Sequence, residues 1–209
     1  MPSSWAGPLS GTDWPITTLP SVTPVSAIAS VATESAAAAS KRRIAIFPNI
    51  DFPLQSDAER SLLTGGLIQA LAFLLHEKAR GEKRPVLLVG PMSVLGNWVR
   101  EAQRFAPSLR SLLHHGPQRA HGDSFVREAQ TVDAVITSYH LLYRDYADFR
   151  KVGWAGILLD EAQNIKNPDT HQAQAARALQ AEYRIALTGT PMENHVGDVW
   201  SIMDFLNPG

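Results

Sequence analysis

The pattern of apolar and polar residues changes near residue 61, and only the later part of the chain is regular. There, short apolar runs alternate with longer segments whose apolar residues recur at helical spacing. The runs predict strands at residues 86–89, 109–114, 132–137, 156–159 and 184–187. The segments predict helices at residues 67–77, 93–105, 118–129, 139–149, 171–179 and 196–205, with Ser93 capping the second. This alternation indicates an α/β fold in which helices flank a parallel sheet.

The first forty residues lack this periodicity. Ser, Thr, Pro and Ala supply 26 of these 40 positions, and only two of the forty are charged. Such a composition offers little apolar surface to offset the entropy cost of ordering, so we predict a largely disordered N-terminal segment. Residues 44–60 are ambiguous because Pro48 and Pro53 interrupt their apolar positions. We therefore divide the chain into a low-complexity segment at 1–60, unrelated to the fold, and a domain at 61–209.

The composition says more about the cellular compartment of the protein than about its function. Of 209 residues, 44% are hydrophobic and 19% charged, which is a normal balance for a globular protein. The sequence has no cysteine, which excludes disulfides and thiolate metal sites. No apolar run is long enough to cross a bilayer, and the N-terminus does not read as a secretory signal, so a cytoplasmic protein without a membrane partner is the default. The net charge of −1 gives no whole-chain signature of nucleic-acid binding.

The strongest chemical signal is a pair of acids at the end of an apolar run. Residues 156–159 lead directly into Asp160 and Glu161, and a second apolar run leads into the segment LTGTP at 187–191. In α/β proteins nucleotides bind at the carboxyl ends of parallel strands. An aspartate there can hold Mg²⁺, and a neighbouring glutamate can orient or deprotonate the attacking water. A solvated acidic turn is the alternative for a lone Asp-Glu pair, but two strand-end motifs in order favour a site.

Four segments together resemble the first RecA-like lobe of the Swi/Snf-type ATPases, which are DNA translocases of helicase superfamily two. The resemblance runs from about Ile68 to Gly209. The segments are VLLVGPMSVLGNWVREAQRFAP at 86–107 for motif Ia, DAVITSYHLL at 133–142 for motif Ib, LLDEAQNIKNP at 158–168 for motif II and IALTGTPMENHVGDVWSIMDFL at 185–206 for motif III. The DEAQ tetrad alone is a weak signal, whereas the order and spacing of all four segments are specific.

The resemblance implies a RecA-like parallel sheet, with ATP and Mg²⁺ as cofactors and double-stranded DNA as a partner. It assigns Asp160 to the magnesium ion and Glu161 to the hydrolytic water. The nucleotide-binding candidates are Gly65, Gly66, Gln163, Thr188 and Gly189. The DNA-binding candidates, whose hydroxyls and strand-end amides suit phosphate oxygens, are Pro91, Ser93, Thr137 and Ser138. Trp98 is expected in the core rather than as a base-stacking platform, and the neighbours His114 and His115 point oppositely on a strand, which argues against a metal pair.

The phosphate loop departs from the family's pattern. The family has Gly-Leu-Gly-Lys-Thr before Ile-Gln, whereas this chain has LTGGL before Ile68 and Gln69. The lysine position is therefore Gly66 and the threonine position Leu67, so the cation for the phosphates and the oxygen for Mg²⁺ are both missing. Gly65 and Gly66 can still present amides at a helix N-terminus.

Two further parts of the family's pattern are not found: the adenine-recognition segment and the second RecA-like lobe. A truncated or frame-shifted reading frame would explain all these departures, and a separate chain could supply the second lobe. We expect weak or no ATP hydrolysis by this chain alone. A non-catalytic DNA- or protein-binding fragment and a non-functional remnant of a broken gene are the alternatives.

Overall fold

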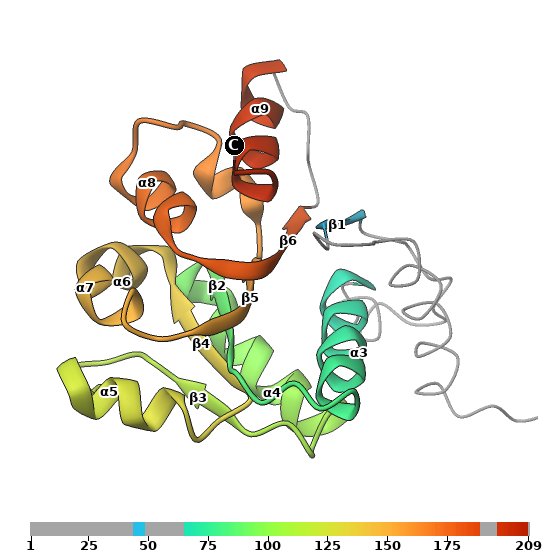
Figure 1. The fold of residues 1–209 in the computed structure, drawn as a ribbon. Coiled ribbons are helices and arrows are strands. Elements are labelled where there is room, and N and C mark those ends of the chain that lie inside the picture. The colour runs from blue at the N-terminus through green and yellow to red at the C-terminus, as the bar shows by residue number, and fades with distance from the viewer. Residues whose placement is uncertain (1–43, 49–64, 189–195, 209) are drawn as a thin grey trace, which may run out of the picture.

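The computed structural model describes residues 44–48, 65–188 and 196–208, which form one parallel sheet with helices on both faces (Figure 1). The strands are β1 (Ile44–Pro48), β2 (Val86–Gly90), β3 (Ser111–Leu113), β4 (Ala134–Ser138), β5 (Trp154–Leu159) and β6 (Ala181–Thr188). Their order across the sheet is β1-β6-β5-β2-β4-β3, and every neighbouring pair is parallel. The predicted α/β fold is therefore confirmed.

The helices lie close to the predicted ranges. They are α3 (Gly65–Ala79), α4 (Leu95–Phe105), α5 (Gly122–Ala129), α6 (Tyr139–Arg144), α7 (Tyr146–Phe149), α8 (His171–Ala178) and α9 (Val196–Leu206). Two details of the prediction are wrong. Ser93 does not cap α4, because it lies inside a 3₁₀ turn at Met92–Val94 and α4 begins at Leu95 without a side-chain cap. The helix predicted at 139–149 is two helices that meet at Asp145.

Strand β1 comes from the segment that the sequence pattern left ambiguous. Its five residues pair with β6 in register, from Ile44 opposite Arg184 to Pro48 opposite Thr188. Five residues of the segment that we assigned to a region unrelated to the fold thus lie at the edge of the sheet. Because β6 also pairs with β5, it is an inner strand. The predicted disorder of the first forty residues falls outside the described residues.

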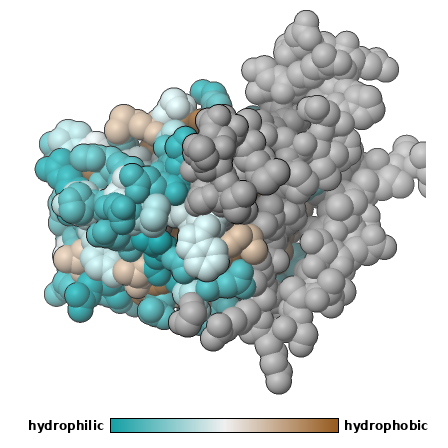
Figure 2. All heavy atoms as spheres, turned by 90° about the horizontal axis from the view of Figure 1, so that it is seen from above, coloured by the Kyte–Doolittle hydropathy of each residue, from teal (hydrophilic) through white to brown (hydrophobic). Residues whose placement is uncertain are grey.

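The sheet separates two hydrophobic layers, as expected when successive side chains of a strand point to opposite faces. In β5, Ile157 and Leu159 pack with α5 to α9, whereas Leu158 packs on the other face with α3 and α4. Both faces of the inner strands are buried, which explains why their sequences read as continuous apolar runs. On the face in Figure 2, the described surface is mainly hydrophilic with a few separate hydrophobic patches. Within the described residues, no helix is both long and apolar enough to cross a membrane.

Candidate functional site

Asp160 lies at the carboxyl edge of the sheet, directly after the inner strand β5. Its backbone N–H donates to the carbonyl oxygen of Val89 at 2.7 Å, which fixes the turn against the end of β2. Gly90 lies beside this turn: a Cβ there would be in ordinary contact with the Cβ of Asp160, at 3.4 Å, and in tighter contact, at 3.2 Å, with a methyl group of Val94. The predicted strand-end position of the acids is therefore present in the fold, between β2 and β6.

Each oxygen of the Asp160 carboxylate accepts a hydrogen bond. The indole Nε1 of Trp98 donates to Oδ2 at 2.6 Å, and the backbone N–H of Glu161 donates to Oδ1 at 2.9 Å. Burial raises the pKa of Asp160; the Trp98 hydrogen bond opposes this shift, and the charge of Glu161 adds to it. The carboxylate is thus partly desolvated beside a second acid, an environment in which a cation would be favourable.

Glu161 has a left-handed backbone conformation, with φ 50° and ψ 57°, which a non-glycine residue rarely adopts. Its Oε2 accepts a hydrogen bond from Nε2 of Gln163 at 2.7 Å, and Oε1 of Gln163 accepts one from the hydroxyl of Thr188 at 3.0 Å. This chain of contacts joins the turn after β5 to the end of β6. Three of the predicted site residues are therefore brought together, whereas Gly189 lies outside the described residues.

The start of α3 lies at the same edge of the sheet as the acids. Lys78, near the end of α3, donates to Asp133 at 2.7 Å, and Asp133 directly precedes β4. Fifteen helical residues span about 22 Å, and Figure 1 shows α3 running from this amino edge toward the carboxyl ends of β1 and β6, so its first residues, Gly65 and Gly66, lie toward the carboxyl edge. Leu67 in its first turn packs into the core with 7% of its surface exposed.

The acidic turn fits a magnesium ion better than α3 fits a triphosphate. Mg²⁺ prefers oxygen ligands and is commonly held by one or two carboxylates together with substrate phosphates and water. Asp160 and Glu161 supply such oxygens, and the described residues contain no cluster of three or more His, Asp or Glu that could form a complete metal cage. At the start of α3, Gly66 has no cation for a phosphate and Leu67 has no oxygen for the metal.

The four residues predicted to contact DNA lie at the ends of β2 and β4. Ser93 is exposed and Pro91 half-buried, in the segment between β2 and α4. Thr137 is buried and its hydroxyl donates to the carbonyl oxygen of His114 at 3.2 Å. The hydroxyl of Ser138 caps α6 by accepting a hydrogen bond from the N–H of Leu141 at 3.3 Å. The Thr137 hydroxyl therefore donates within the chain, whereas the bond from Leu141 uses only the oxygen of Ser138, so the O–H of Ser138 is the better placed of the two for a phosphate contact.

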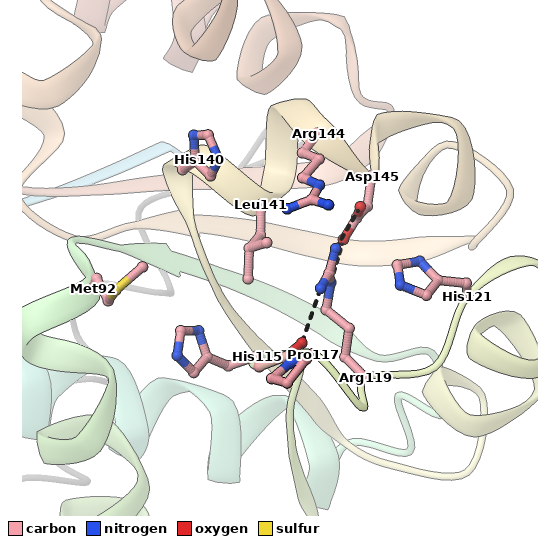
Figure 3. A pocket seen from close by; sticks show the side chains of 10 residues that line it. Met92, His115, Pro117, Arg119, His121, His140, Leu141, Arg144 and Asp145 are labelled. Carbon is pink, nitrogen blue, oxygen red and sulfur yellow. Dashed lines mark hydrogen bonds and ion pairs between the residues drawn. The ribbon is translucent and has the colours of Figure 1, made fainter.

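A cavity of about 560 Å³ lies between these two segments and the loop after β3. Figure 3 shows Met92, His115 and His140 on one side of it and Arg119, Asp145 and His121 on the other, with Arg144 extending from α6 toward the middle. Among the described residues that line the cavity, two are arginines, three are histidines and one is an acid. The cavity was not predicted from the sequence, because Arg119, in the loop after β3, and Arg144, on α6, are far apart in the sequence.

The one acid of the cavity is already neutralised. Asp145 accepts hydrogen bonds from Arg119, at 2.6 Å to Nε and 3.0 Å to Nη2, and lies 3.0 Å from Nε2 of the buried His114. Although burial alone would raise the pKa of Asp145, the bonds from Arg119 and His114 lower it. Burial lowers the pKa of His114, and the bond to Asp145 offsets only part of that shift. Arg144, His115, His121 and His140 therefore lie beside a neutralised carboxylate.

Two aromatic contacts with Asp160 were also missed. Trp98 is fully buried, so the expectation that it belongs to the core is confirmed, yet its indole N–H also bonds to Asp160. The hydroxyl of Tyr139 donates to the carbonyl oxygen of Asp160 at 2.8 Å. Burial raises the pKa of Tyr139 well above its usual value, so the phenol keeps its proton. The sequence did offer a signal for these contacts, because the polar group of a buried tryptophan or tyrosine usually has a hydrogen-bond partner.

Comparison with known proteins identifies the family to which the chain is similar. The family model described as SNF2-related domain matches residues 64–209. The "Putative ATP-dependent helicase/translocase YwqA" of Bacillus subtilis is 50% identical over 146 residues, covering 69% of this chain and 16% of the relative. The ISWI chromatin-remodeling complex ATPase CHR17 of Arabidopsis thaliana is 34% identical over 148 residues, covering 69% of this chain and 14% of that protein.

A solved structure agrees in fold. The Sulfolobus solfataricus SWI2/SNF2 ATPase core in complex with dsDNA matches with a TM-score of 0.67 and 34% identity, over 88% of this chain and 35% of that one. The fold is that of a RecA-like lobe. The chain belongs to the SNF2-related family and is the N-terminal lobe of a Swi/Snf-type ATPase of helicase superfamily two. It spans only a small part of the length of these relatives.

Proposed function

We propose that this chain is the nucleotide-binding lobe of an ATP-dependent translocase that acts on double-stranded DNA. The observation that supports it most is the hydrogen-bonded series from Asp160 through Glu161 and Gln163 to Thr188, at the carboxyl edge of the sheet. Nucleotides bind at this edge in parallel α/β folds. The relatives' names contribute helicase, translocase and ATPase activities, which we extend to this chain as a proposal.

Each residue of the acidic turn has a proposed role. Asp160 would hold the magnesium ion of Mg-ATP, and that ion would neutralise the charge that develops on the phosphoryl group. Glu161 orients the attacking water through the carboxylate oxygen that Gln163 leaves free, since the amide of Gln163 bonds to the other oxygen. Thr188 holds Gln163 in that orientation from the end of β6. A movement of Thr188 or Gln163 would therefore displace the carboxylate oxygen of Glu161 that faces the water.

Nucleotide binding by the present sequence is expected to be weak. A hydrogen bond to a charged group contributes about 1.5–3 kcal/mol, and each 1.4 kcal/mol corresponds to about a tenfold change in affinity. Without a lysine at Gly66, ATP should bind about ten- to a hundredfold more weakly than in a complete phosphate loop. We accordingly propose that this lobe alone hydrolyses ATP weakly or undetectably, and that hydrolysis requires a second lobe.

DNA contact is proposed for the cavity described above, which we call the cationic cavity because Arg119 and Arg144 line it, and for the segments beside it. Arg144, His115 and His140 surround a hollow between the Pro91–Ser93 segment and the start of α6, and phosphate oxygens suit such donors. Contacts of this type grip the DNA backbone without reading its sequence. The structural neighbour that was solved with dsDNA supports this choice of partner.

A second candidate is a DNA- or protein-binding module without catalysis. The observation in its favour is Leu67, which replaces the expected hydroxyl and is packed into the core. Binding of a fluorescent ATP analogue in the presence of Mg²⁺ separates the two functions. The proposed lobe binds the analogue in a Mg²⁺-dependent way, and Asp160→Asn weakens this binding. Duplex DNA binding with no nucleotide binding at millimolar analogue would establish the second candidate instead.

A further inference from the structure

Trp98 connects the acidic turn to one of the segments proposed for DNA contact. It lies in the first turn of α4, and α4 follows Pro91–Val94 without a break. The indole ring is fully buried, and its N–H donates to Oδ2 of Asp160 at 2.6 Å. A buried ring in close packing cannot shift alone. Movement of the segment after β2 would therefore carry the indole N–H with it and change its contact with the carboxylate.

Tyr139 makes the corresponding connection from the other segment. It is the first residue of α6, directly after Thr137 and Ser138 at the end of β4. Its hydroxyl donates to the carbonyl oxygen of Asp160 at 2.8 Å, and its ring is buried in the core. One contact thus reaches the side chain of Asp160 and the other its backbone. The two donors approach the same residue from two different strand ends.

We infer that Trp98 and Tyr139 are positioning residues that couple DNA contact at the ends of β2 and β4 to the placement of Asp160. This inference rests on the proposed function, since it requires DNA at those strand ends. When DNA shifts either segment, the donor it carries moves relative to Asp160, and the acid turns with it. By linkage, nucleotide binding at Asp160 changes DNA affinity by the same factor by which DNA changes nucleotide affinity.

The indole N–H resonances of the ¹⁵N-labelled chain provide a direct test. Trp98→Phe assigns the Trp98 resonance. Trp154 is a matched internal control, because its buried indole also donates a hydrogen bond, at 2.9 Å, but to the carbonyl oxygen of Phe149. Asp160→Asn replaces the charged acceptor by a neutral one, so the Trp98 resonance should move while that of Trp154 stays. A short DNA duplex should likewise move the Trp98 resonance and leave that of Trp154 in place.

The possible outcomes separate this inference from the proposed function. DNA binding with an unmoved Trp98 resonance overturns the coupling and leaves the proposed DNA contact intact, whereas absence of DNA binding overturns both. A Trp98 resonance that ignores Asp160→Asn also overturns the inference.

Tyr139→Phe removes only a hydroxyl and keeps the test decisive if Trp98→Phe fails to fold. In the unsubstituted chain, DNA should change the affinity for Mg-ATP by at least about fivefold, the lower end of typical coupling. Tyr139→Phe should reduce that factor toward one while DNA affinity without nucleotide stays the same. An unchanged factor would contradict the role of Tyr139.

Discussion

The hydroxyl of Thr188 donates a hydrogen bond to Oε1 of Gln163 at 3.0 Å, and this contact joins β6 to the acidic turn after β5. The amide of Gln163 then donates to Glu161 from its other end. Because the amide has one acceptor and one donor end, the Thr188 bond determines which end faces Glu161. A carboxylate at the end of β5 is thereby held by a hydroxyl on the neighbouring strand.

Removing this hydroxyl should weaken the nucleotide site and leave the fold in place. Thr188→Val keeps the shape of the buried side chain but leaves Oε1 of Gln163 without its donor, which should cost about 1 kcal/mol of unfolding free energy. The magnesium-dependent affinity for an ATP analogue should also fall, because Gln163 would no longer be held in its orientation toward Glu161. Thr188→Ser retains the hydroxyl and serves as the control. Equal losses of affinity in both variants would show that the methyl group, rather than the bond, matters.

Gly156 should be intolerant of any side chain. A Cβ at this position would lie 2.0 Å from Cε2 of Tyr183, whose ring is buried and packs edge-on against Phe73 with centroids 5.1 Å apart. Gly156→Ala should therefore lower the free energy of unfolding by about 1–3 kcal/mol, as overpacking of a core does. Gly153→Ala is the matched control, since nothing lies within 4 Å of its Cβ. Chemical denaturation measures both, and equal stabilities would contradict the described packing.

Stability should fall as the solution is made mildly acidic, because of His114. Its pKa lies below the ordinary value of 6.5, so the unfolded chain takes up a proton at a higher pH than the folded one. The contribution of His114 is thus complete above pH 6.5 and is lost as pH falls toward the folded pKa, by up to about 1.4 kcal/mol per pH unit. Asp145, Arg119 and His121 are the charged or titratable groups that influence it.

His114→Gln isolates this effect. Glutamine can still donate to Asp145 but does not titrate, so the slope of unfolding free energy against pH between 7 and 5 should be shallower in the variant. Asp145 adds a second loss only at lower pH, because its pKa is depressed below 3.8. Denaturant titrations at several pH values measure the slope. An identical slope in the variant and the unsubstituted chain would show that His114 is not the responsible group.

Arg144 should contribute to DNA affinity through a phosphate contact. Its exposed guanidinium extends into the cationic cavity. Arg144→Ala should weaken binding of unrelated duplexes to a similar degree and lower the slope of log affinity against log salt concentration by about 1. Arg80→Ala removes an equally exposed arginine after the far end of α3 and should change neither quantity. Equal effects of the two substitutions would indicate nonspecific charge attraction.

The sequence predicted those parts of the fold that depend on local pattern. Buried strands such as Val86–Gly90 read as apolar runs because both of their faces are covered, and the acids after β5 follow from where that run ends. The break between α6 and α7 was not predictable in this way. It depends on Asp145, whose partners Arg119 and His114 come from a loop 26 to 31 residues away.

The same distinction applies to the site. The alignment of motifs located Asp160, Glu161 and Thr188, but not the donors that orient them. Trp98 lies 62 residues from Asp160 in the sequence, and its apolar character predicted burial without revealing the direction of its N–H. Strand β1 was missed because its pairing with β6 spans most of the chain and its short sequence ends in a proline.

The most direct test of the central claim is to restore the phosphate loop and ask whether the gain depends on Asp160. Gly66→Lys with Leu67→Thr should raise Mg²⁺-dependent affinity for an ATP analogue about ten- to a hundredfold, and adding Asp160→Asn should remove most of that gain. Gly66→Ala with Leu67→Val controls for the altered start of α3. No gain on restoration, or a gain that persists without Mg²⁺ and without Asp160, would contradict a triphosphate site formed by α3 and the acidic turn.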